Sequence, residues 1–227
     1  MLVEEWMTTN VITVTADTSM MKVARMLKDH NIRRMPVVNE DGVLIGIVTD
    51  RDVKDASPSK ATTLEVHELY YLLSELKVKD IMTKNPRKAY CKDSVESIAL
   101  MMRKHSFGGV PVVDDNEKVC GIITDTDIFG LLTHFTGIMG GGMQVALELP
   151  NKVGALKGVL DELLTLNVNI VSVLTGLENA NAPMCKVYIR LSRVDDAIGE
   201  KVISILREKF NLRYWEKGLS DETLENL

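Results

Sequence analysis

The stretch GIVTDRD, residues 46–52, decides the fold because it returns as GIITDTD, residues 121–127. Extending the match outward aligns residues 7–53 with residues 82–128 without a gap, at a constant offset of 75. Both copies also carry Pro-Val-Val ten residues before the glycine. A repeat of this length in one register indicates a duplicated structural unit.

Each copy predicts the same order of elements. A short strand leads to an amphipathic helix that begins at good N-cap residues, Asp17–Ser19 in one copy and Asp93–Ser94 in the other. The Pro-Val-Val segment, a turn and the strand that ends at the quoted motif follow, and then a second helix. The order is strand-helix-strand-strand-helix, twice, so the sequence predicts an α/β fold with two pseudo-equivalent halves.

The remaining segments differ from the repeat. Leu69, Leu72, Leu73 and Leu76 predict a helix between the copies. Residues 137–142 are glycine-rich and predict a linker, with a phosphate-binding loop as the alternative. Beyond them the pattern predicts β-α-β-β-α-β, the ferredoxin-like order. The predicted divisions are 1–58 (first repeat), 59–76 (connecting segment), 77–136 (second repeat), 137–142 (linker), 143–217 (third domain) and 218–227 (tail).

Composition excludes several classes of protein. The chain has 227 residues and a formal net charge of −5, which gives no reason to expect a nucleic-acid or membrane partner. No run approaches the ~18 apolar residues of a membrane span, and no signal peptide is evident. The cysteines Cys91, Cys120 and Cys185 show no metal-binding or disulfide spacing, which favours a cytoplasmic location.

The repeated motif has three interpretations. Thr49 with Asp52, and Thr124 with Asp127, have the spacing of a helix capping box. The same groups could bind a ribose-phosphate, because a hydroxyl and free helix amides suit phosphate and an aspartate accepts from a ribose diol. A metal site would use Asp50, Asp52, Asp125 and Asp127, but no histidine or cysteine ligand pattern accompanies them. The four histidines sit near no nucleophile motif, so no catalytic residue is predicted.

The repeat resembles a tandem of cystathionine-β-synthase (CBS) domains, a Bateman module, through its "MT-x-N", "PVV" and "G-I-[VI]-T-D-x-D" motifs. The resemblance implies two repeats packed about a pseudo-two-fold axis, with two clefts that bind AMP, ADP, ATP or S-adenosylmethionine. It places Thr49 and Thr124 at phosphate or ribose, and Asp52 and Asp127 at the ribose diol. Each cleft is completed by the other repeat, through Ile12, Ile32, Arg33, Arg34 and Met35, or through Arg87, Phe107, Gly108, Gly109 and Val110.

The two sets of wall residues differ. Arg33-Arg34 precede Pro-Val-Val in the first repeat, and Gly108-Gly109 take their place in the second. The arginines are either a solvated edge or phosphate contacts, and the glycines would let backbone approach a ligand closely. We therefore expect two similar sites of unequal affinity.

Residues 143–217 resemble an ACT domain through ELPNKVGAL (148–156) and NVNIVSV (167–173). That resemblance implies an amino-acid effector site, usually shared across a domain interface, formed by Asn151, Gly154, Ala155 and Asn169. A sheet that serves only dimerisation is the alternative. The whole architecture resembles the acetoin-utilisation regulatory proteins of the AcuB type. It predicts a non-catalytic, homodimeric regulator of a partner enzyme. The alternatives are a metal-dependent small hydrolase and a ligand-free oligomerisation module.

Overall fold

The structure is a computed structural model that describes residues 1–57, 75–220 and 223. The predicted connecting helix lies outside the described residues, apart from its last two positions. The chain forms two compact units, Met1–Phe129 (unit 1) and Gly130–Leu227 (unit 2). The division falls within helix α6 (Asp125–Thr136), ahead of the glycine-rich segment. In the described part of the chain, no helix combines the length and apolar character needed to cross a membrane.

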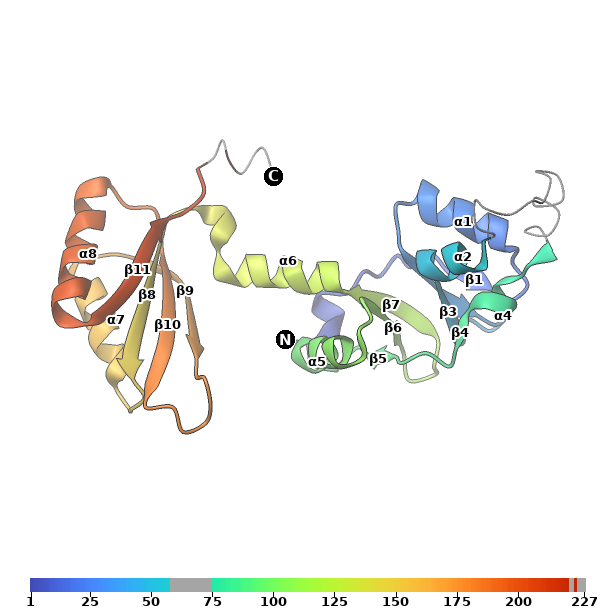
Figure 1. Cartoon of the computed structure of the whole chain (residues 1–227), viewed down its shortest axis with the longest axis horizontal. Coiled ribbons are helices and arrows are strands. Elements are labelled where there is room, and N and C mark those ends of the chain that lie inside the picture. Colours follow the sequence, from blue (N-terminus) through green and yellow to red (C-terminus); the bar gives the residue numbers. More distant parts are fainter. Residues whose placement is uncertain (58–74, 221–222, 224–227) are drawn as a thin grey trace. The chain divides into compact units, whose positions relative to one another are not determined.

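Unit 1 holds the two repeats (Figure 1). In the first, β1 (Val14–Thr15) lies parallel to β2 (Arg34–Val38), which pairs antiparallel with β3 (Leu44–Thr49). In the second, β5 (Ala89–Tyr90), β6 (Gly109–Val113) and β7 (Val119–Thr124) pair in the same way. The helices are η1 (Val3–Glu5), α1 (Met20–Asp29), α2 (Asp50–Ala56), α4 (Val78–Ile81), α5 (Val95–His105) and α6. The predicted β-α-β-β-α order is confirmed in both copies.

Helix α1 shows how sequence positions the first repeat. Ser19 caps it by accepting a hydrogen bond from the Lys22 amide at 3.4 Å. Val23 and Leu27 lie one helical turn apart on the same face and are buried against Met35 and Val37 of β2. Burying one such side chain stabilises the fold by about 1.5–3 kcal/mol. Ser94 caps α5 in the same way, through the Ser97 amide at 3.1 Å.

Each repeat is completed by the segment that opens the other repeat. Strand β4 (Thr83–Lys84), which opens the second repeat, pairs with β3 of the first, and Thr8 makes the equivalent bridge to β7. Val3 and Val78, which are equivalent positions, are both fully buried. These bridges map onto each other through the offset of 75, which confirms the pseudo-two-fold pair. The reciprocal bridges are Thr83–Ile47 with Thr8–Ile122, and Ser19–Lys77 with Leu2–Ser94.

Unit 2 is a four-stranded antiparallel sheet in the order β11-β8-β10-β9. Its elements are η2 (Ile138–Gly140), β8 (Met143–Pro150), α7 (Ala155–Thr165), β9 (Ile170–Gly176), β10 (Met184–Leu191), α8 (Asp196–Lys209) and β11 (Asn211–Lys217). This is the predicted ferredoxin-like β-α-β-β-α-β fold. Both helices cover one face of the sheet (Figure 1). Alternate residues of the central strands, such as Leu147 and Ile189, are buried against Val159 and Leu206 of the helices.

One charged side chain is buried in unit 2. Arg190 of β10 is only 3% exposed, and its NH2 donates to Gln144 Oε1 at 2.7 Å. Its Nε and NH1 atoms have no hydrogen-bond partner among the described residues. Gln144 is therefore the acceptor that compensates the burial of this guanidinium group.

Two thiols that the sequence separates lie together in unit 1. The sulfur atoms of Cys91 and Cys120 are 3.5 Å apart, and all three cysteines of the chain are free. Burial, together with the hydrogen bond shared with Cys91, raises the pKa of the Cys120 thiol to about 11. Spacing along the chain did not indicate this pair, because strand pairing in the β5-β6-β7 sheet brings the two positions together.

Candidate functional site

The two repeated motifs form the same capping box. The Thr49 amide and hydroxyl donate to Asp52 Oδ2 at 2.7 and 2.8 Å, and the Asp52 amide donates to Thr49 Oγ1 at 3.2 Å. In the second copy the corresponding distances for Thr124 and Asp127 are 2.7, 2.7 and 3.3 Å. Both threonines therefore begin helices, and both aspartates are held in one orientation by bonds to a single carboxylate oxygen.

The first box borders a cavity of about 910 Å³ between the two repeats of unit 1. The first repeat contributes Arg33, Arg34, Ile47, Thr49, Asp50, Arg51, Asp52, Lys54 and Asp55. The second contributes Thr83, Asn85, Pro86, Arg87, Ser106, Phe107, Gly108, Gly109 and Pro111. The structure thus brings Thr49 and Asp52 to the same cavity as Arg87 and the 107–109 segment. Arg33 and Arg34, which the resemblance placed at the other cleft, line this one.

The remaining predicted residues lie elsewhere. Thr124 and Asp127 are half-buried, and Ile12 and Ile32 pack against the core of the first repeat. Met35 and Val110 are fully buried, because alternate positions of β2 and β6 point into the cores. Their side chains are not among those that line the 910 Å³ cavity.

Arg34 and the glycine pair contact each other, although they were expected to form unlike walls of two clefts. Arg34 NH1 donates to the Gly108 carbonyl oxygen. A Cβ atom added at Gly109 would lie 2.9 Å from Arg34 Cδ, closer than real Cβ contacts occur. Burial lowers the pKa of Arg34, and the nearby carboxylate of Asp125 opposes that shift. The space that a side chain at position 109 would need is therefore filled by Arg34.

The carboxylates of the motifs bind the amides of their own helices. Asp50 Oδ1 accepts from the Arg51 amide at 3.0 Å, and Asp125 Oδ1 accepts from the Thr126 amide at 2.9 Å. Asp52 and Asp127 take part in the capping boxes. Across residues 1–57, 75–220 and 223, no three His, Cys, Asp or Glu side chains are grouped so that they could hold a metal ion.

In unit 2, the predicted effector residues fall at two ends of the sheet. The Asn151 amide donates to Pro183 O at 2.8 Å and its side chain donates to Ala182 O at 3.0 Å. Gly154 has a φ of +84°, which favours glycine, and Ala155 begins α7. Asn169 precedes β9 at the end of the sheet where Met143 pairs with Leu191, whereas Asn151 follows Pro150 at the other end. Seven strand residues at ~3.3 Å each separate these ends by roughly 23 Å, so one chain does not bring the two asparagines together.

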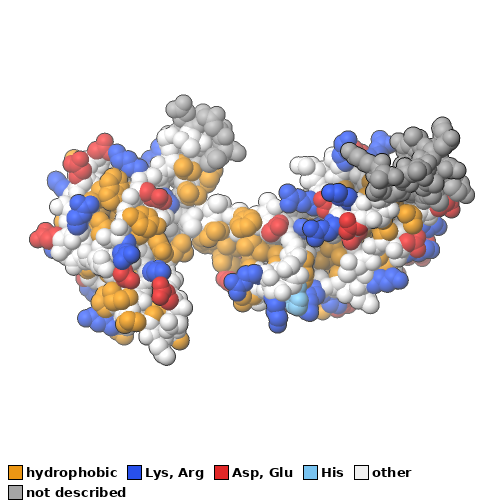
Figure 2. Space-filling view, viewed as in Figure 1, with side chains coloured by type: hydrophobic (Ala, Val, Ile, Leu, Met, Phe, Trp, Pro, Cys, Tyr) orange, Lys and Arg blue, Asp and Glu red, His pale blue; other side chains and the backbone are white. Residues whose placement is uncertain are grey.

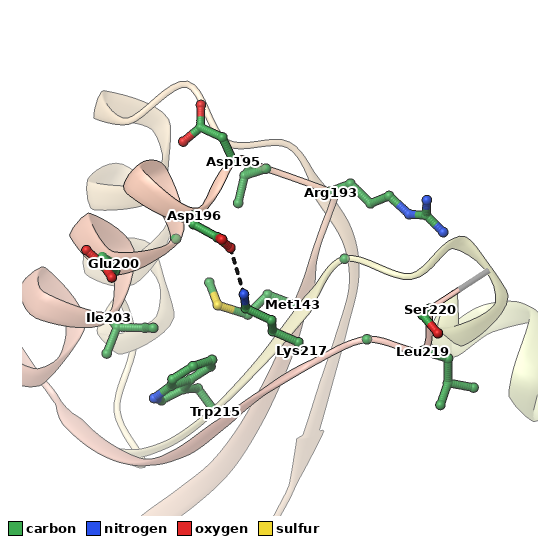
Figure 3. A pocket seen from close by; sticks show the side chains of 14 residues that line it. Met143, Arg193, Asp195, Asp196, Glu200, Ile203, Trp215, Lys217, Leu219 and Ser220 are labelled. Carbon is green, nitrogen blue, oxygen red and sulfur yellow. Dashed lines mark hydrogen bonds and ion pairs between the residues drawn. The ribbon is translucent and has the colours of Figure 1, made fainter. Parts of the chain in front are cut away.

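A second cavity, of about 430 Å³, lies between the start of α8 and β11 (Figure 3). Trp215 and Ile203 line it together with Asp195 and Glu200. Lys217 Nζ lies 2.7 Å from Asp196 Oδ1, and this hydrogen bond lowers the pKa of Asp196. Both partners of the ion pair are well exposed, so it adds little to stability. None of the predicted effector residues lines this cavity.

Comparison with known proteins identifies unit 1. The family model of the CBS domain matches residues 3–59 and 78–134. The chain belongs to the CBS domain family. A CBS domain-containing protein of Dictyostelium discoideum is 34% identical over 131 residues, which cover 58% of this chain and 90% of that protein. The acetoin utilization protein AcuB of Vibrio cholerae matches with a TM-score of 0.51 and 25% identity, over 61% of this chain and 94% of AcuB.

Some relatives are much longer enzymes. The L-aspartate semialdehyde sulfurtransferase of Methanocaldococcus jannaschii is 35% identical over 127 residues, which are 56% of this chain but 22% of the enzyme. The chain therefore spans about a fifth of that protein. The match lies in a part of the enzyme no longer than a CBS pair, and residues beyond 134 lie outside the CBS family match.

Proposed function

We propose that the protein is a non-catalytic regulator whose CBS pair binds an adenine nucleotide, AMP, ADP, ATP or S-adenosylmethionine. The observation that carries this proposal is the capping box of Thr49 and Asp52 at a cavity lined by both repeats. A volume of about 910 Å³ suits a ligand of nucleotide size. The same box occurs at Thr124 and Asp127, so a second ligand position is expected there.

The box leaves polar groups for a ligand. Both Asp52 bonds use Oδ2, and Oδ1 takes no hydrogen bond from the rest of the described chain. A carboxylate oxygen that is fixed in this way can accept from a ribose hydroxyl. Because its orientation is already set by Thr49, the aspartate loses little further freedom on binding.

Regulation would follow from the position of the ligand between the repeats. A nucleotide that contacts side chains of both repeats favours the packing in which those contacts are made. The change in packing would reach a partner enzyme in the cytoplasm, in a homodimer of this chain. The similarity to the acetoin utilization protein AcuB supports the CBS-pair fold and does not assign the pathway.

The test is a thermal-shift titration of the full chain with AMP, ADP, ATP and S-adenosylmethionine. A ligand that binds only the folded state raises the melting temperature by mass action. We expect at least one of these compounds to do so. Asp52→Ala and Asp127→Ala should each reduce the shift, and the double variant Asp52→Ala, Asp127→Ala should remove it. Ser19→Ala removes the cap of α1, away from the cavity, and controls for general destabilisation. A nucleotide-induced shift of unchanged size in the double variant would refute the site.

We further propose that unit 2 is an ACT domain that binds an amino acid. The ferredoxin-like order and the tight turn at Gly154 support this assignment. Because Asn169 lies at the far end of the same sheet, a site that uses both ends needs two copies of the chain. Amino-acid binding should therefore weaken when dilution shifts the mass measured by light scattering from dimer to monomer. If the chain dimerises but no amino acid binds to it, the proposed effector site is wrong and unit 2 serves only dimerisation.

A further inference from the structure

The cavity at Thr49 is lined by more basic than acidic side chains. Five basic side chains line it, against the three carboxylates of Asp50, Asp52 and Asp55. Arg51, Lys54 and Arg87 are exposed, and none of them makes an ion pair within the residues that the structure describes. The chain as a whole carries a net charge of −5, so this excess of positive charge is local. Figure 2 shows Lys and Arg side chains gathered beside a few acidic ones on the visible face of this unit.

The second copy of the repeat provides an internal comparison. The offset of 75 takes Arg51 to Thr126 and Lys54 to Phe129, and it takes Ile12 to Arg87. The three exposed cations of the first cleft are therefore replaced by uncharged residues at the equivalent positions of the other repeat. The capping boxes themselves are the same in both copies, with bond lengths that agree within 0.1 Å. The ligand position expected at Thr124 and Asp127 therefore differs from the cavity at Thr49 in charge and not in the groups expected at the ribose.

We propose that the cleft at Thr49 selects a nucleoside that carries two or more phosphate groups, whereas the ligand position expected at Thr124 does not select phosphates. This inference rests on the proposed function and narrows its ligand. Guanidinium groups bind phosphate oxygens through paired N–H donors, and Arg51 and Arg87 reach the cavity from opposite repeats. S-adenosylmethionine carries a net positive charge from its sulfonium and ammonium groups, so these cations repel it. The favoured ligand is ADP or ATP.

The test is isothermal titration of the full chain with adenosine, AMP, ADP and S-adenosylmethionine, without divalent ions. We expect ADP to bind at least tenfold more tightly than adenosine, with one such tight site per chain. Raising the salt concentration should weaken the binding of ADP and leave the binding of adenosine unchanged. The double variant Arg51→Thr, Arg87→Ile, which installs the residues of the other cleft, should raise the Kd for ADP about tenfold, or about 1.4 kcal/mol. Its Kd for adenosine should stay within about twofold.

Arg103→Thr is the matched control, because Arg103 is an exposed cation of α5 that does not line the cavity. This variant should leave the Kd values for ADP and for adenosine unchanged. Equal affinity for adenosine and ADP in the natural chain, or an equal loss of both in the double variant, overturns the charge selection and leaves adenine binding intact. Tighter binding of S-adenosylmethionine than of ADP also overturns it. A chain that binds none of the four compounds refutes the proposed function and this inference with it.

Discussion

Replacing Gly109 by alanine tests the contact between the two repeats at Arg34. The added Cβ would lie 2.9 Å from both Cδ and Cζ of Arg34, so the side chain must move away. Moving it breaks the hydrogen bond from NH1 to the Gly108 carbonyl oxygen. A hydrogen bond to a charged group contributes about 1.5–3 kcal/mol. Alanine also restricts the conformations of the unfolded chain, and Gly109 has no positive φ that would strain an alanine in the folded state. This effect stabilises the protein by about 0.4–1 kcal/mol and offsets part of the loss. The expected net loss of unfolding free energy is about 0.5–2.6 kcal/mol.

The sign of the effect should reverse once Arg34 is absent. In an Arg34→Ala background the three atoms nearest to the new methyl group are gone, so Gly109→Ala should then stabilise the protein by about 0.4–1 kcal/mol. Urea unfolding of the four chains of this double-mutant cycle measures the coupling. The chain has two tryptophans, and a Trp215→Phe background leaves only Trp6, which reports on unit 1.

Gly130→Ala controls for the effect of replacing a glycine by alanine at a position where the added methyl group displaces no side chain. No heavy atom lies within 4 Å of a Cβ added there, and the position is inside α6, where alanine is favoured over glycine. This variant should be at least as stable as the natural chain. If Gly109→Ala destabilises the protein equally with and without Arg34, the contact does not exist in solution and the reasoning is wrong.

Three further predictions concern other parts of the chain. Thr49→Ala and Thr124→Ala should each lower the free energy of unfolding by about 0.5–2 kcal/mol in urea, and serine should restore it, because both threonines are N-caps. The pKa of Cys120, about 11 against an ordinary 9.0, means that its neutral thiol stabilises the fold fully below pH 9, and this contribution is lost as the pH rises to about 11. Alkylation of Cys120 followed by mass spectrometry should therefore accelerate toward pH 11, whereas rapid labelling at pH 8 would contradict the assignment. Gln144→Leu should cost about 1–3 kcal/mol of unfolding free energy, because it leaves the buried Arg190 without its acceptor, and Arg190→Met should relieve most of that loss.

The sequence predicted what depends on local pattern. The Thr-x-x-Asp spacing predicted both capping boxes, and the repeat in one register predicted the same strand and helix order twice. The sequence did not predict that the segment that opens each repeat pairs with the other repeat, although two pairs of identical residues indicate it. Met7 and Met82 are identical, as are Gly46 and Gly121. The structure pairs them crosswise, with Met82 Sδ 2.5 Å from a Cβ added at Gly46 and Met7 Cγ 3.1 Å from one at Gly121.

Contacts between distant segments could not be predicted in this way. Cys91 and Cys120 meet through strand pairing across 29 residues of chain, and no spacing rule indicates such a pair. The two effector asparagines are close to familiar motifs, but their separation depends on which end of the sheet each one occupies. That position follows from the strand order β11-β8-β10-β9 of the ferredoxin-like fold, whereas the resemblance assigned both asparagines to one site by their neighbouring residues alone.

The unequal residues at 33–34 and 108–109 have a physical cause in the duplication. Positions 34 and 109 are equivalent in the two repeats and contact each other, so they lie at the pseudo-two-fold axis. Two arginines there would compete for one space and repel each other, whereas two glycines would leave it empty and lose the bond to Gly108 O. One large and one small residue satisfy the packing, which requires the repeats to differ at this point whatever they bind. The difference between the clefts as ligand sites must therefore come from residues away from the axis, and Arg51, Lys54 and Arg87 are the ones that the first cleft has and the second lacks.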